Sequence, residues 1–155
     1  MSFDVSAFLA EGEREQETYR EERQAERNEL MDRQDSGIME ITDDPGKYAV
    51  YLDMQARNLR YSPGNTVLIM QQRPEAQEVL SMDEWKKIKR TVRPEERTEG
   101  IRILRPKEYS GVRKSDYISE SGEYFPAGET YSGNGYQVYL VYDVSQTTGT
   151  PYTPT

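Results

Sequence analysis

The negative charge of this chain is concentrated at its N-terminal end, and this limits which residues can form a core. Residues 1–45 hold fourteen acidic and five basic side chains, a net charge of −9, whereas residues 46–155 have a net charge of +1. Leu, Ile, Val and Phe make up only 17% of the sequence, too few to bury a strongly charged segment as well. We therefore divide the chain into an acidic arm at 1–37, a folded domain at 38–147 and a linker or tail at 148–155.

The acidic arm has the composition of a helix but not the pattern of a packed one. Glu, Gln and Arg are good helix formers, and Glu29 and Arg33 lie one helical turn apart. The apolar residues between Glu11 and Asp35 are too few for a coiled-coil seam. The sequence predicts a solvated helix or a disordered arm, and little contribution to the core from residues before Asp35.

Two residue types that carry much of enzyme chemistry are missing. The chain contains neither Cys nor His, which excludes disulfides, thiolate nucleophiles, Ser-His-Asp triads and the usual zinc sites. We therefore predict a protein that is not an enzyme and that holds no metal and no cofactor. No apolar run approaches the ~18 residues of a membrane span, and the N-terminus is acidic, so we expect a cytoplasmic protein with no membrane partner.

Apolar spacing and capping residues predict three helices after the arm. Apolar residues at intervals of three and four predict an amphipathic helix over 47–60. Asn65 is placed to cap a short helix over 65–72. The segment Ser81–Glu84 has the form of a capping box, which predicts a third helix over 82–89.

Two segments have the clearest strand patterns. Apolar and basic residues alternate at the start of Ile101–Arg105, and this strand is expected to end at Pro106. Tyr136–Val144 carries apolar residues on both faces, which predicts that this strand is buried on both sides. Residues 107–135 contain turn signals and are expected to form a hairpin or an elaborated loop. The predicted fold is α/β (α+β), with three or so helices packed on a small, mostly antiparallel sheet in which these two segments pair. A charged helical or disordered N-terminal arm precedes it.

Positive charge gathers next to aromatic residues in the middle of the chain. Between Trp85 and Lys114 there are eleven basic and four acidic residues. Proteins that bind single strands combine a cationic track for phosphates with aromatic faces for bases. Structural roles remain open: the bases can form a solvated surface, Trp85 can belong to the core, and Tyr61 and Asn65 can cap a helix. The candidate DNA-binding residues are Tyr61, Asn65, Trp85, Lys86, Lys87, Lys89, Arg90, Arg93, Arg102 and Arg105.

An ordered series of short motifs runs through the same region. It consists of Tyr61–Asn65, Gln72–Ala76, Trp85–Lys87, Arg90–Val92, Gly100–Ile103 and Val141–Thr147. In order and spacing this series resembles the N-terminal domain of the antirestriction protein ArdC, over about residues 45–150. The resemblance implies an α/β domain from plasmids and other mobile genetic elements that binds single-stranded DNA with little sequence preference. It also implies a protein that protects DNA entering by conjugation from restriction.

The resemblance implies one further partner. Full-length relatives carry a C-terminal metallopeptidase-like domain with a His-Glu-x-x-His motif, which is absent from this chain. We therefore expect either an excised domain or a stand-alone relative.

The expected function is a non-catalytic single-stranded DNA-binding domain of an antirestriction-type protein. Another nucleic acid, such as RNA, stays open as the partner. So do two other interpretations, a protein-interaction module with a tyrosine-rich contact surface and an acidic DNA mimic. A mimic should be acidic over its folded body, whereas here only the arm is acidic.

Overall fold

The computed structural model describes residues 4–153 and divides the chain into two compact units. The first unit is formed by Met1–Leu104 and Val138–Thr155, and the second by Arg105–Gln137. The described residues contain four α-helices and small antiparallel sheets, so the predicted α+β class is confirmed. Residues 1–3 of the predicted arm and 154–155 of the predicted tail lie outside the described residues.

Helix α1, Val5–Asp43, includes the whole described part of the acidic arm and continues past it. The Asp4 side chain accepts a hydrogen bond from the Ala7 amide and so caps the helix. Residues 4–25 are exposed throughout, as expected for a solvated helix. The expectation that residues before Asp35 contribute little to the core is wrong at Leu30, which is fully buried.

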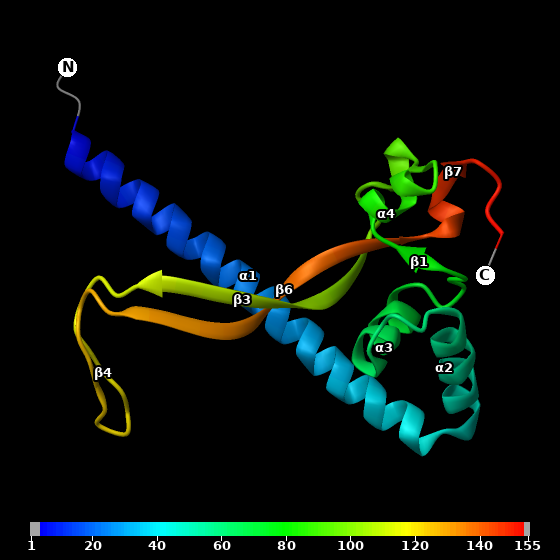
Figure 1. The fold of residues 1–155 in the computed structure, drawn as a ribbon, viewed down its shortest axis with the longest axis horizontal. Coiled ribbons are helices and arrows are strands. Elements are labelled where there is room, and N and C mark those ends of the chain that lie inside the picture. The colour runs from blue at the N-terminus through cyan, green and yellow to red at the C-terminus, as the bar shows by residue number, and fades with distance from the viewer. Residues whose placement is uncertain (1–3, 154–155) are drawn as a thin grey trace. The chain divides into compact units, whose positions relative to one another are not determined.

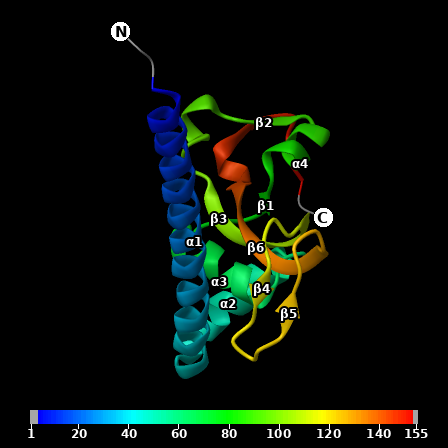
Figure 2. The same ribbon diagram turned by 90° about the vertical axis from the view of Figure 1, so that its left-hand side faces the viewer.

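The second part of α1 packs against two shorter helices, α2 (Pro45–Arg57) and α3 (Pro63–Gln72) (Figures 1 and 2). Leu30 contacts Leu68 of α3 in one apolar cluster. Gly37 lets α1 and α3 lie close together, because a Cβ atom there would lie 2.3 Å from Cγ1 of Val67. A side chain at position 37 would therefore push α1 away from α3.

The three predicted helices are present, with shifted ends. They are α2, Pro45–Arg57; α3, Pro63–Gln72; and α4, Met82–Lys87. The capping box of Ser81 and Glu84 is formed as predicted. The cap of α3 is Ser62, not Asn65, because the Ser62 hydroxyl accepts the Asn65 amide and leaves the Asn65 side chain for other partners.

The main sheet has the strand order β1-β6-β3, from β1, Val79–Leu80; β6, Thr130–Asp143; and β3, Ile101–Val112. The predicted pairing of the two clearest strand segments is therefore confirmed. β1 runs antiparallel to β6, with Val79 opposite Asp143. Burial of β6 on both faces holds only near its end: Val141 and Tyr142 are buried, whereas Leu140 is exposed.

Side-chain amides cover both outer edges of this sheet, and we call them the amide clips. On β3, the Asn65 amide donates to the Leu104 carbonyl at 2.8 Å and accepts the Leu104 N–H at 3.0 Å. Gln72 makes the same pair of bonds with the backbone of Arg102, at 2.7 and 2.8 Å. Asn58 does so on the β1 side, accepting from Val79 and donating to Gln77. The clips replace the neighbouring strand that each edge lacks.

The clips also explain why β3 continues beyond the proline that was expected to end it. Arg102 and Leu104 direct their N–H groups to the outer edge of β3, toward the clips. Backbone direction repeats every second residue, so position 106 faces the same outer edge. Pro106 lacks an N–H there without removing a hydrogen bond to β6.

The last described part of the chain, which was expected to be a linker or tail, packs within the first unit. β7, Thr147–Gly149, pairs antiparallel with β2, Arg90–Val92. The Tyr152 ring then meets the Trp85 ring edge to face, with 5.3 Å between centroids. The expected tail at 148–155 is therefore ordered as far as it is described. Two short 3₁₀ turns, η1 at Pro94–Glu96 and η2 at Val144–Gln146, complete the unit.

The second unit contains the hairpin expected within 107–135. Its strands are β4, Tyr117–Ile118, and β5, Tyr124–Phe125, and they pair antiparallel. The remaining residues of this unit belong largely to the neighbouring parts of β3 and β6 (Figure 1). Of the helices that the structure describes, none is long and apolar enough to cross a membrane.

Candidate functional site

Trp85 of α4 lies in the core of the first unit. Its side chain has 0% exposure and packs in one cluster with Val92 and Tyr142. The indole Nε1 donates to the Tyr142 carbonyl at 2.9 Å, which satisfies its only polar group. In this conformation the ring cannot stack on a base, so the structural role left open for Trp85 is the one observed.

Tyr61 and Asn65 also hold the fold together. The Tyr61 hydroxyl donates to the Val79 carbonyl at 2.6 Å, and the ring packs against the cluster that contains Met54 and Ile69. Burial raises the pKa of this phenol well above its usual range, so Tyr61 stays neutral. Asn65 is one of the amide clips. Neither side chain presents its polar group to a ligand.

Three of the candidate arginines are bound to other parts of the chain. Arg90 donates to the hydroxyl and carbonyl of Thr147, at 2.9 and 3.1 Å, and so fastens β7. Arg93 pairs with Glu96 at 3.2 Å, and Arg102 pairs with Glu26 of α1 at 3.2 Å. The structure therefore assigns local structural partners to these guanidinium groups.

Three candidate lysines have the opposite surroundings, and we call them the lysine cluster: Lys86, Lys87 and Lys89. All three are exposed, and among the described residues none forms an ion pair or a side-chain hydrogen bond. The nearby Glu84 is paired with Arg60 and caps α4, so its charge is already balanced. The cluster lies within four consecutive positions at the end of α4. The remaining candidate, Arg105, is exposed in the second unit.

Lys89 has an unusual backbone. Its φ angle is 63°, the left-handed region that favours glycine, and among the described residues it is the only non-glycine in that region. It follows Ile88, the C-cap of α4, and its N–H donates to the Lys86 carbonyl at 3.0 Å. Glycine is the usual residue at this position of a helix end. Here the turn carries a free charge instead.

The last motif of the ordered series, Val141–Thr147, holds backbone segments together. Asp143 is buried and accepts from the Gln77 amide at 2.8 Å and from the Ser145 hydroxyl at 2.6 Å. Gln146, also buried, donates to the Glu99 carbonyl at 2.9 Å and to Glu96 at 3.1 Å. The hydrogen bond from Gln146, together with Arg93 and Arg73, lowers the pKa of Glu96. These hydrogen bonds give Asp143 and Gln146 structural roles.

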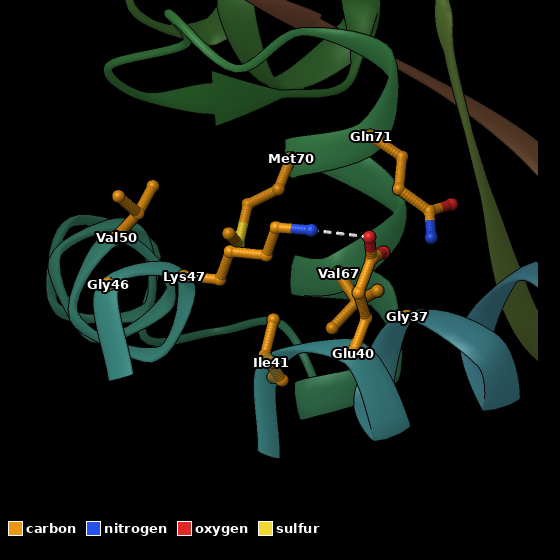
Figure 3. A pocket seen from close by; sticks show the side chains of 9 residues that line it. All are labelled: Gly37, Glu40, Ile41, Gly46, Lys47, Val50, Val67, Met70 and Gln71. Carbon is orange, nitrogen blue, oxygen red and sulfur yellow. Dashed lines mark hydrogen bonds and ion pairs between the residues drawn. The ribbon is translucent and has the colours of Figure 1, made fainter. Parts of the chain in front are cut away.

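An apolar pocket lies between α1, α2 and α3 (Figure 3). Its volume is about 250 Å³, slightly below the range of small-molecule sites. The Lys47 ammonium contacts the Glu40 carboxylate at 2.5 Å beside it, which raises the pKa of Lys47. Its polar side chains already have partners, Lys47 with Glu40 and the Gln71 amide with the Arg33 carbonyl at 3.0 Å, so the pocket carries no functional assignment. The lining residues are Gly37, Glu40, Ile41, Gly46, Lys47, Val50, Val67, Met70 and Gln71.

Residues 4–153 contain no group of three or more acidic side chains arranged to hold a metal ion. Sequence reasoning found the lysine cluster but missed the backbone of Lys89 and the clip residues Asn58 and Gln72. A basic residue directly after the C-cap of a short helix is the only signal that the sequence offered for Lys89.

Comparisons with models of protein families, with curated proteins and with solved structures found no match for this chain. The resemblance to the ArdC N-terminal domain therefore stays a prediction.

Proposed function

We propose that this chain is a non-catalytic single-stranded DNA-binding domain of the antirestriction type. The observation that carries the proposal is the lysine cluster, three exposed and unpaired cations on one short turn of the first unit. Phosphate groups are the ligands that such a turn fits best, because ammonium groups bind them without a required geometry. In this proposal the protein acts in the cytoplasm on DNA brought in by a mobile element.

The conformation of Lys89 supports the proposal. A non-glycine residue in the left-handed region costs about 1–2 kcal/mol. Residues held in such conformations are often found at functional sites. A lysine at this position gives the turn a third cation at the expense of fold stability, which is consistent with a binding role.

The test is a fluorescence anisotropy titration of a labelled oligothymidylate with the whole chain at several salt concentrations. Binding through phosphates should weaken as salt rises, with a slope of about 0.7 per phosphate contact in a plot of log affinity against log salt. Replacing Lys86 and Lys89 together by glutamate should weaken binding at low salt at least ~10-fold and reduce the slope by about 1 or more.

The matched control is a charge change elsewhere on the same unit. Arg14→Glu combined with Arg20→Glu, both on the exposed part of α1, alters the net charge by the same amount without touching the lysine cluster. It should have a much smaller effect on affinity and none on the slope. No binding by the unaltered chain at low salt, or equal effects of the α1 double variant and the cluster variant, would reject the proposal.

One observation favours the DNA-mimic alternative. The first half of α1 is an exposed helix whose residues 4–25 carry seven acidic and three basic side chains. A mimic would inhibit a DNA-binding protein in the absence of DNA, and removing this helix half would abolish that inhibition. Under the single-strand proposal, removing this helix half should instead strengthen DNA binding, because the negative helix repels DNA.

A further inference from the structure

The second unit has a two-stranded ribbon whose faces differ in chemistry. The ring of Tyr109 on β3 covers two glycines of β6: a Cβ atom would lie 3.0 Å from this ring at Gly133 and 3.1 Å at Gly135. Tyr131 on β6 covers Gly111 of β3 in a similar way: a Cβ atom there would lie 2.7 Å from the Tyr131 hydroxyl and 2.9 Å from its ring. Side chains alternate along a strand, so these residues share one face, which we call the tyrosine face.

The two rings are fixed platforms. Each rests on the backbone of the neighbouring strand, where glycine leaves room for it, and each residue is partly open to solvent. Tyr109 is 52% exposed and Tyr131 is 39% exposed. A ring held in this way loses little conformational freedom when a second flat group stacks on it. The arrangement differs from that of Trp85, whose ring is wholly buried.

Positive charge lies on the same face. Alternation places Arg105 and Lys107 beside Tyr109, and it places Glu108 on the opposite face. Lys107 is exposed and forms no ion pair among the described residues. The face therefore combines stacking surfaces with cations, which complements the bases and phosphates of a single strand.

Arg113 fastens the hairpin β4–β5 to the end of this ribbon. Its guanidinium carbon lies 4.5 Å from the ring centre of Phe125, 5.6 Å from that of Tyr117 and 5.3 Å from that of Tyr131. Each contact is a cation–π interaction. Tyr131 is thus held by Arg113 as well as by Gly111, which fixes the tyrosine face further.

We propose that the tyrosine face is a second nucleic-acid contact, on which bases of a single strand stack against Tyr109 and Tyr131 while Lys107 meets the backbone. This inference rests on the proposed function and adds the part of the chain that recognises bases. Contact through ring faces is shared by all four bases, so the face fits a ligand of any sequence. It also requires unpaired bases, so duplex DNA should not use it.

The test uses the whole chain and a short oligothymidylate in which one base is 5-iodouracil, a group that cross-links to a stacked aromatic ring on irradiation. Peptide mass spectrometry should place the cross-link on Tyr109 or Tyr131. Cross-links found only outside the tyrosine face would overturn the proposal.

Substitutions give an independent measurement. Tyr109→Leu and Tyr131→Leu should each weaken binding ~5- to 100-fold with the salt slope unchanged, because stacking releases no counterions. Tyr109→Phe keeps the ring and should bind as the unaltered chain does, which also guards against a variant that fails to fold. The matched control is Tyr136→Leu: this exposed tyrosine lies on the opposite face, so its loss should leave affinity unchanged.

The outcomes separate this inference from the proposed function. Salt-dependent binding that responds to the lysine cluster but not to Tyr109 or Tyr131 would overturn the tyrosine face and leave the function standing. Absence of all single-strand binding would overturn both. Concentration-dependent self-association that Tyr109→Leu abolishes, without DNA binding, would assign the face to a protein contact and reject the proposal.

Discussion

At the scale of single residues, Lys89 is the informative position, because its backbone conformation lowers stability while its charge serves the proposed binding. Lys89 adopts a left-handed backbone with φ 63°, and its carbonyl accepts the Thr150 N–H at 3.2 Å, which joins the turn to the last part of the chain. Glycine would make the same backbone bonds without the steric cost of a Cβ. The lysine adds only its charge.

We predict that Lys89→Gly raises the free energy of unfolding by about 1 kcal/mol and weakens single-strand binding. The two effects have opposite signs because glycine relieves the backbone while removing a cation. Chemical denaturation and the oligothymidylate titration measure them. Lys86→Gln removes a charge from the same cluster without a change of backbone and should weaken binding without raising stability. Loss of stability in Lys89→Gly would show that the turn is not strained.

A second prediction concerns acid. The hydrogen bond from Gln146, with help from Arg93 and Arg73, lowers the pKa of Glu96 in the folded protein, whereas an unfolded Glu titrates near ~4.3. Its contribution to stability is therefore present above that pH and is lost as the pH falls through the lower folded value.

Glu96→Gln should lower the melting temperature at neutral pH and make its decline below about pH 4 shallower than in the unaltered chain. Thermal unfolding followed by circular dichroism over that range checks this. The control is Glu13→Gln, an exposed position on α1, which should change neither quantity. Parallel acid profiles for the Glu96 variant and the unaltered chain would contradict the assignment.

At the scale of elements, the amide clips determine how helix α3 and strand β3 are joined. Asn65 uses both its donor and its acceptor on the backbone of Leu104, and a carboxylate can supply only the acceptor. Asn65→Asp should therefore leave the Leu104 carbonyl unpaired and destabilise the fold by about 1–3 kcal/mol. Denaturant unfolding measures this, and Asn28→Asp at an exposed position of α1 makes the same chemical change as a control.

Elements that are determined by residues close together in the sequence were predictable from it. The capping box of Ser81 and Glu84 is local, and α4 begins where it predicts. The end of β3 was missed because Pro106 is tolerated only when its nitrogen faces an open edge, and that orientation depends on which strand is its neighbour. The clips were missed because Asn65 and Leu104 are distant in sequence, and nothing in the sequence pairs them.

At the scale of the whole molecule, α1 is the longest described helix, and its acidic first half is exposed to solvent. Removing residues 1–22 takes away a net charge of −5 from a part that is exposed wherever it is described. We predict that this truncation leaves the melting temperature unchanged and strengthens single-strand binding at low salt, with the gain disappearing at high salt.

Leu30→Ala is the companion to that truncation. It should cost about 2–5 kcal/mol of stability, because Leu30 is fully buried against Leu68 and Leu104. Thermal unfolding of both variants compares them directly. A large loss of melting temperature in the truncated chain would show that the first turns of α1 pack on the body.

The sequence predicted the kind of candidate site, basic residues near aromatic ones, but not which of these residues belong to it. Charge and aromatic content identified the region, yet seven of the ten chosen side chains lie outside the lysine cluster, and the structural contacts of six of these are described above. Whether a given Trp or Arg faces solvent depends on tertiary packing, and Trp85 met Tyr152 only because the end of the chain folds back. A signal for the tyrosine face was present in the sequence. Tyr and Gly recur at intervals of two within each strand: Tyr109 and Gly111 on β3, and Tyr131, Gly133 and Gly135 on β6.

The strand order β1-β6-β3 has a consequence for how the protein is made. β6 occupies the centre of the sheet, but a ribosome synthesises it last of the three strands. A nascent chain that has not reached β6 holds β1 and β3 with no shared partner, while α1, α2 and α3 are already complete. Because segments that emerge first fold first and distant pairings form slowly, we expect a helical scaffold during translation and a sheet that closes only near its end. Until then the amides of α3, synthesised before β3, can protect its outer edge.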